Sequence, residues 1–189
     1  MSTLQQEFPR RHPISVHDYH RMAAAGILHE DSRVELIEGE IIDMTPIGTV
    51  HASTVAYLCK KLQLAVGNRA VVWPQNPLRL SEYSEPQPDI TLLRPRDDFY
   101  RDAHPQAADV LLLIEVADTS IWSDRERKIP FYARHGIPEV WLVDVGNKSL
   151  ESFRDPREGT YRDIRRIAAM DCVEALQLPG VQIDLSELF

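Results

Sequence analysis

The stretch that decides the fold is V-L-L-L-I-E-V, residues 110–116, the most apolar run in the chain. Its apolar and polar residues do not alternate, which is typical of a strand that is covered on both faces of a sheet. Glu115 is the only charged residue of the run. An unpaired carboxylate there would cost roughly several kcal/mol, so Glu115 requires a cation, a metal ion or a proton, unless it lies at an exposed strand end or pairs with an arginine.

The segments on both sides of this strand predict a layered α/β domain. On its C-terminal side we expect a helix over about 123–135, which ends at Gly136, and a second buried strand over 140–145. A strand, helix, strand unit of this kind indicates a central mixed β-sheet flanked by helices. The other expected elements are a helix from Ser15 to about Ala25, a hairpin of 34–37 and 41–44, a helix over 50–66, strands at 70–73, 77–80 and 89–93, a meander over 150–167 and a closing turn over 181–189.

Length and composition indicate one globular domain. A chain of 189 residues predicts a single core, which we place at residues 13–189 behind a flexible tail of residues 1–12. Hydrophobic residues make up 43% and charged residues 26%, which excludes a disordered or fibrous protein. The sequence lacks both a membrane-spanning run and a signal-peptide core, so we expect a cytoplasmic protein without membrane contact. Cys59 and Cys172 lie too far apart to indicate a zinc site or a disulfide scaffold.

The net charge of −8 bears on possible partners. A protein of this charge repels polyanions as a whole. If it handles nucleic acid, a local basic patch or bound metal ions must overcome that repulsion.

Asp89 is the second informative carboxylate. Pro86-Gln87-Pro88 delivers an extended chain into a strand that begins with Asp89, so the strand displays an acid at one sheet edge, as the Glu115 strand does. Two such carboxylates repel each other unless a divalent ion lies between them. The alternative is that Asp89 caps a turn, which is the commoner role for an Asp beside Pro.

Three residues of the next helix share one face. Lys128 follows Asp124 by four residues and precedes Tyr132 by four. They could form a solvated ion pair, but Pro130 would bend the helix and direct Lys128 and Tyr132 towards the sheet edge. Glu35 and His51 are further polar candidates; a lone His at a helix start is more often a packing residue than a ligand.

Together these residues resemble the Uma-two family of restriction-endonuclease-like proteins, a branch of the PD-(D/E)XK nuclease superfamily. The resemblance covers about residues 14–184 and rests on the order and spacing of six pieces. These are E-L-I-E-G-E-I (35–41), His51, P-D-I (88–90), I-E-V (114–116), D-x-x-x-K-x-x-x-Y (124–132) and G-I-P-E-V-W-L-V-D (136–144).

The resemblance implies a restriction-endonuclease-like core that hydrolyses DNA phosphodiester bonds. Asp89, Glu115 and the Val116 carbonyl would bind Mg²⁺ or Mn²⁺, and Lys128 would position the attacking water and neutralise charge. Glu35 would complete the acidic cluster as a ligand or base. His51, Tyr132 and Asp124 would support the site, and hard oxygen ligands suit Mg²⁺ or Mn²⁺ better than zinc.

The sequence departs from the superfamily signature beside Glu115. A lysine is expected two residues later, where Ala117 stands, and Asp118 adds negative charge. The resemblance suggests that Lys128 replaces the missing lysine. The alternative is a catalytically degenerate module that binds nucleic acid or protein. A homodimer is expected from base rates and would help a nuclease act on two strands.

Overall fold

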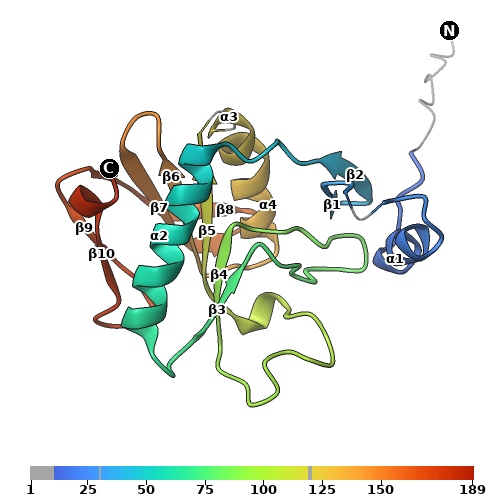
Figure 1. Cartoon of the computed structure of the whole chain (residues 1–189), viewed down its shortest axis with the longest axis horizontal. Helices are drawn as coiled ribbons and strands as arrows, with labels where there is room; N and C mark the ends of the chain where they lie inside the picture. Colours follow the sequence, from blue (N-terminus) through green and yellow to red (C-terminus); the bar gives the residue numbers. More distant parts are fainter. Residues whose placement is uncertain (1–10, 30, 119–120) are drawn as a thin grey trace, which may run out of the picture.

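A six-stranded mixed sheet with helices on both faces forms the body of the protein (Figure 1). The computed structural model describes residues 11–29, 31–118 and 121–189, so most of the expected tail over 1–12 lies outside the described residues. The elements are α1 (Val16–Ala24), β1 (Val34–Ile37), β2 (Glu40–Asp43), α2 (Thr49–Val66), β3 (Val71–Pro74), β4 (Ile90–Leu93), η1 (Ala107–Asp109), β5 (Val110–Ala117), α3 (Ile121–Ser123), η2 (Asp124–Lys128), α4 (Ile129–Arg134), β6 (Glu139–Asp144), β7 (Ser149–Arg157), β8 (Thr160–Ala168), β9 (Cys172–Glu174), β10 (Gln182–Asp184) and η3 (Leu185–Glu187).

The strand order is β3-β4-β5-β6-β7-β8, and only β5 and β6 run parallel. All eight residues of β5 are buried. Leu112 and Ile114 pack in the cluster that contains the α2 side chains, whereas Leu113 packs in the cluster that contains Phe131 and Tyr132 of α4. Two covered faces explain why β5 has no polar alternation. The expected α/β class, a central mixed sheet flanked by helices, is confirmed.

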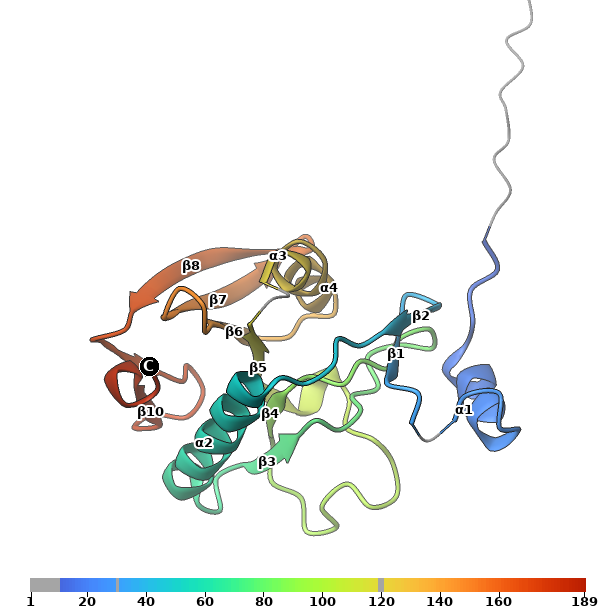
Figure 2. The ribbon, with the colours of Figure 1, turned by 45° about the horizontal axis from the view of Figure 1, so that its top comes forward.

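The first three elements, α1, β1 and β2, lie beside the six-stranded sheet and not in it (Figure 2). Ser15 caps α1 as predicted, because its hydroxyl accepts a hydrogen bond from the Asp18 N–H at 3.1 Å. The predicted hairpin is also present, and its turn residues Glu38 and Gly39 have φ angles of 50° and 79°. A Cβ at Gly39 would lie 2.5 Å from Pro13 Cβ, so only glycine fits this turn.

Two expected elements are wrong. Residues 77–80 are not a strand: their N–H groups bond to scattered loop carbonyls, among them Pro86 O for Leu78 and Pro105 O for Arg79, and no ladder forms. The single helix expected over 123–135 is three pieces, α3, a π-helical turn (η2) and α4. Among the described helices, none is both long and apolar enough to cross a membrane.

Candidate active site

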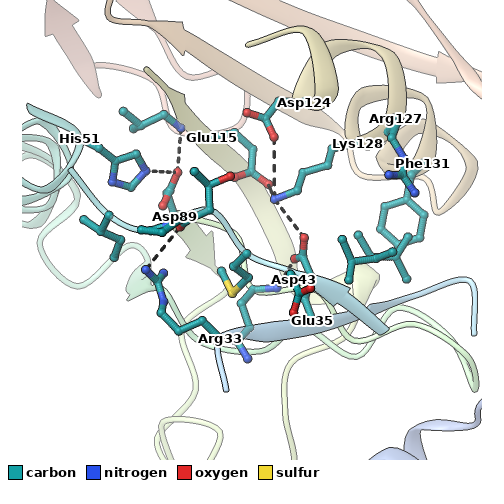
Figure 3. A pocket seen from close by; sticks show the side chains of 18 of the residues that line it. Arg33, Glu35, Asp43, His51, Asp89, Glu115, Asp124, Arg127, Lys128 and Phe131 are labelled. Carbon is teal, nitrogen blue, oxygen red and sulfur yellow. Dashed lines mark hydrogen bonds and ion pairs between the residues drawn. The ribbon is translucent and has the colours of Figure 1, made fainter. Parts of the chain in front are cut away.

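A cleft of about 690 Å³ opens at the sheet edge where β4 begins and β5 ends. It is bordered by the β1–β2 hairpin, the start of α2, and the η2 turn (Figure 3). Nine Asp or Glu side chains line it, against four Lys or Arg side chains. The cleft is therefore acidic, as is the molecule as a whole, whose net charge is −8.

Strand register brings Asp89 and Glu115 together. Ile90 pairs with Ile114 in the antiparallel ladder of β4 and β5, so the residue before β4 lies across from Glu115. Directly opposite residues project to the same side of a sheet with Cβ atoms roughly 5 Å apart. The Asp89 Oδ2 atom also accepts a hydrogen bond from the Val116 N–H at 2.9 Å, which fixes the carboxylate beside β5.

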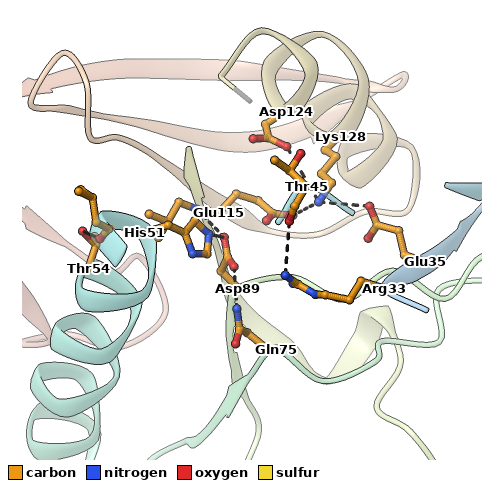
Figure 4. Close-up of polar contacts among 12 residues, drawn as sticks. Arg33, Glu35, Thr45, His51, Thr54, Gln75, Asp89, Glu115, Asp124 and Lys128 are labelled. Carbon is orange, nitrogen blue, oxygen red and sulfur yellow. Dashed lines mark hydrogen bonds and ion pairs between the residues drawn. The ribbon is translucent and has the colours of Figure 1, made fainter. Parts of the chain in front are cut away.

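The Lys128 ammonium lies among three carboxylates. Its Nζ atom is 3.3 Å from Glu115 Oε1, 3.3 Å from Glu35 Oε1 and 4.0 Å from Asp124 Oδ1 (Figure 4). Burial alone would lower the pKa of Lys128, but these carboxylates outweigh it and raise the pKa above its usual value. The lysine is therefore charged, and the alternative of a solvated pair with Asp124 is wrong.

The π-helical turn explains how Lys128 reaches the sheet. Pro130 lacks an N–H and its ring crowds the carbonyl four residues earlier, at Glu126, so a regular α-helix is disfavoured there. The chain widens to five π-helical residues, 124–128, immediately before Pro130. Such single π turns often occur at functional sites. Ala117, which stands where the resemblance led us to expect a lysine, is fully buried in the core with side chains of α4.

Glu35 comes from a separate part of the chain. It lies on β1, is 2% exposed, and its Oε2 atom accepts a hydrogen bond from the Gln87 N–H at 3.2 Å. That bond ties the hairpin to the segment that leads into Asp89. Glu35 thus joins the Lys128 cluster from the side of the cleft opposite β5.

His51, in the first turn of α2, contacts Asp89. Its Nε2 atom lies 3.1 Å from Asp89 Oδ2, and its Nδ1 atom is buried without a hydrogen-bond partner among the described residues. The hydrogen bond to Asp89 raises the pKa of His51, against the opposite effect of burial. His51 is therefore more than a packing residue at the helix start, because its imidazole contacts the Asp89 carboxylate.

Glu115 accepts a hydrogen bond from the phenol of Tyr132. The Tyr132 hydroxyl donates to Glu115 Oε1 at 2.5 Å, and both side chains are buried. Burial raises the pKa of Glu115 to about 8; Lys128 opposes this rise, and the neighbouring acids Asp89, Asp124 and Glu35 add to it. Burial and the same carboxylate raise the pKa of Tyr132 well above its usual value, so the phenol keeps its proton.

The cluster as a whole holds more negative than positive charge. Four carboxylates, Glu35, Asp89, Glu115 and Asp124, face one lysine and one histidine. Either a proton or a cation must balance the excess, and a divalent ion such as Mg²⁺ or Mn²⁺ fits because the four acids offer hard carboxylate oxygens as ligands. Among the described residues, no three His, Cys, Asp or Glu side chains are placed to hold one ion. The ligands from the chain would then be the carboxylates of Asp89 and Glu115 with the Val116 carbonyl. Water or substrate would fill the remaining coordination positions.

The structure brings all the sequence-predicted site residues to one place. Glu35, His51, Asp89, Glu115, Val116, Asp124 and Lys128 line the cleft, and Tyr132 lies directly behind Glu115. Sequence reasoning missed Arg33, which lines the cleft just before β1, and Gln75, whose Nε2 atom lies 3.4 Å from Asp89 Oδ1. Neither stands in a recognisable motif.

Both the fold and the family of the chain are nuclease-like. A crystal structure described as a "putative nuclease belonging to DUF820", from Anabaena variabilis ATCC 29413, superposes with a TM-score of 0.73 at 16% identity, covering 94% of this chain and 98% of that one. The Uma2 family model, described as "Putative restriction endonuclease", matches residues 16–186, and the chain belongs to this family. No curated protein matches the chain.

Proposed function

We propose that the protein is a divalent-metal-dependent endonuclease that hydrolyses DNA phosphodiester bonds. The observation that carries the proposal is that Asp89, just before β4, lies across from Glu115 on β5, with the Lys128 ammonium 3.3 Å from Glu115. Membership of a family described as restriction endonucleases supports nuclease chemistry. The placement of the site within the PD-(D/E)XK superfamily, the metal and the DNA substrate are parts of the proposal.

Each residue has a distinct part in this chemistry. Asp89 and Glu115, with the Val116 carbonyl, would hold Mg²⁺ or Mn²⁺, which supplies a bound water of lowered pKa and neutralises charge on the reacting phosphate. Lys128 holds an ammonium beside the same position, where it adds to the field that stabilises the pentavalent transition state. Tyr132 and Glu35 fix Glu115 and Lys128, and His51 fixes Asp89.

The test is cleavage of supercoiled plasmid by the purified chain with Mg²⁺ or Mn²⁺, and without metal. Asp89→Asn keeps the shape of the side chain and removes the charge, so it should abolish nicking. Glu126→Gln is the matched control, because Glu126 lines the same cleft but is exposed and lies outside the cluster. Wild-type nicking that persists in Asp89→Asn would contradict the proposal.

A second candidate is a degenerate module that binds nucleic acid or protein without cleaving it. The acidic lining of the cleft and the buried Ala117 in place of the expected lysine favour it. Calorimetry separates the two functions: an active site should bind Mn²⁺ stoichiometrically and lose that binding in Asp89→Asn, whereas a degenerate site should show no such binding.

A homodimer remains part of the proposal, since two copies of the cleft would allow both strands of a duplex to be cut. Analytical ultracentrifugation of the purified chain checks it.

A further inference from the structure

The arginines of this protein fall into two groups by their partners. On β7 and β8 most guanidinium groups are neutralised nearby, as Arg157 is by Asp155 at 2.9 Å, Arg162 by Glu158 at 2.8 Å and Arg165 by Asp163 at 3.0 Å. Arg166 instead donates to the Ser149 hydroxyl at 3.4 Å. Because their charges are balanced, these ion pairs attract a polyanion only weakly. The strand surface that looks most basic in the sequence is therefore a poor place for nucleic acid.

Two arginines of the cleft behave differently. Among the described residues, no carboxylate oxygen lies within 4.0 Å of the guanidinium of Arg33 or of Arg127. Arg33 makes one long bond, from NH1 to the Thr45 carbonyl at 3.4 Å. Both side chains are exposed, and both line the cleft that holds Asp89 and Glu115.

Arginines outside the cleft, such as Arg69 and Arg94, also form no ion pair among the described residues, so the informative feature is the acidic surroundings of Arg33 and Arg127. Nine carboxylates line the cleft, and Arg134 on the same wall already pairs with Glu38 at 2.9 Å. Two guanidinium groups that stay unpaired among so many acids keep their donors available for an incoming anion. Guanidinium is planar and binds the paired oxygens of a phosphate through two parallel hydrogen bonds, which an ammonium does not.

The positions of the two arginines in the chain also favour binding of an anion. Arg33 stands immediately before β1, two residues from Glu35, and Arg127 stands in η2 directly before Lys128. In Figure 3 the Lys128–Glu35 ion pair is drawn between the two arginines. A nucleic-acid strand laid across the cluster would meet one guanidinium on each side of the reacting position.

We propose that Arg33 and Arg127 are the phosphate-binding residues of this cleft and hold the phosphodiesters on either side of the one that is cut. The inference rests on the proposed function for its substrate class, but it concerns binding and not hydrolysis. It also indicates how a chain of net charge −8 could hold a polyanion, because two guanidinium groups without a carboxylate partner among the described residues lie inside the cleft.

The test measures binding separately from cleavage. Fluorescence anisotropy with a fluorescein-labelled DNA duplex in CaCl₂, at several KCl concentrations, is carried out on the full chain and on Arg33→Gln and Arg127→Gln. Each variant should bind roughly tenfold more weakly, since a hydrogen-bonded charge is lost. Each should also lower the salt slope of log K by about 0.9, the value for one phosphate contact.

Arg134→Gln is the matched control. It removes the same charge from the same cleft, but from a guanidinium that Glu38 already occupies, so binding should weaken by less than about threefold and the salt slope should stay the same. Equal losses in all three variants would show a bulk-charge effect and overturn the inference. Wild-type protein that does not bind the duplex, or Arg33 and Arg127 variants that bind like wild type, would overturn it as well.

Circular dichroism melts confirm that each variant is folded. If Arg33→Gln does not fold, Arg33→Lys replaces it; the retained charge with the lost second donor should give a smaller loss of affinity than the glutamine. The two proposals fail separately. Arginine-dependent binding without any cleavage would sustain the inference and count against the nuclease, whereas cleavage that is indifferent to both arginines would do the reverse.

Discussion

Two buried glutamates stand on adjacent parallel strands of one sheet, and their surroundings differ in a decisive way. Glu139, on β6, is 0% exposed and receives hydrogen bonds from the Trp141 indole at 2.8 Å, from the Arg154 guanidinium and from the Leu176 N–H at 2.7 Å. One arginine balances one carboxylate, and both oxygens are used. Glu139 and Arg154 thus form a fully hydrogen-bonded structural ion pair that holds β7 and the C-terminal segment against β6.

Glu115, on β5, is almost as deeply buried but is not balanced. It shares a single lysine with Glu35 and Asp124, and it borders a cleft. Among the described residues, Lys128 and Tyr132 both donate to Oε1 of this carboxylate, which leaves Oε2 for another partner. A buried acid does not by itself indicate a functional site. A buried acid whose charge is not balanced by its neighbours does.

The largest expected difference between the two glutamates is in catalysis. Glu115→Gln should reduce metal-dependent plasmid cleavage by roughly a thousandfold, because it removes a metal ligand and its charge. Its free energy of unfolding should fall by no more than about 1 kcal/mol, since glutamine resembles the protonated carboxyl that the raised pKa of Glu115 favours without metal. Plasmid-nicking rates and urea unfolding of the same preparation check both effects; unchanged cleavage would remove Glu115 from the site.

Glu139→Gln should show the reverse pattern. Breaking a buried pair leaves Arg154 without its counter-charge and should cost about 3–5 kcal/mol in the free energy of unfolding. Cleavage per folded molecule should not change, because Glu139 does not line the cleft. Urea denaturation with activity normalised to folded protein measures this; a loss of activity without a loss of stability would contradict the distinction.

A metal ion should stabilise only a protein with an intact cluster. With Mn²⁺ at about one hundred times its dissociation constant, the free energy of unfolding of the wild type should rise by about 2.7 kcal/mol. The increase should vanish in Asp89→Asn and persist in Glu139→Gln after correction for its lower starting stability. Differential scanning calorimetry with and without Mn²⁺ provides the comparison, and equal stabilisation of all three proteins would place the ion elsewhere.

The smallest effect should appear with pH in metal-free protein. Because the pKa of folded Glu115 is raised to about 8 from 4.5, the folded state binds more protons than the unfolded state in this window, and stability falls as pH rises. From about pH 6 to about pH 7 the chelator-treated wild type should lose about 1 kcal/mol more than Glu115→Gln. Urea unfolding at both pH values checks it; parallel pH dependences would show that Glu115 does not carry the extra proton.

The parts of the molecule that local pattern determines were predictable. An apolar run without alternation identified β5, and the two acid-bearing strand ends identified Asp89 and Glu115 because neighbouring strands share an edge. The hairpin followed from Glu38-Gly39. The expected strand over 77–80 failed because an apolar pattern does not show whether a ladder partner is present.

Other features depend on contacts between distant segments. Whether an arginine is paired is a property of its spatial neighbours, so the sequence does not distinguish Arg33 from Arg165. In the same way, Glu139 and Glu115 both stand in apolar strands, and only the folded protein shows that Arg154 meets one of them while Lys128 is shared at the other. Whether a charge is balanced thus depends on the tertiary structure.

The π-helical turn before Pro130 makes the number of residues between β5 and α4 part of the site. One residue advances an α-helix by about 100°. Deleting one of residues 125–127 would rotate the Lys128 side chain about the helix axis, away from Glu115, although no residue of the Lys128 cluster would be lost. The spacing of this segment is thus as restrictive as the identity of its lysine, and single-residue gaps there should be far rarer in functional relatives than substitutions.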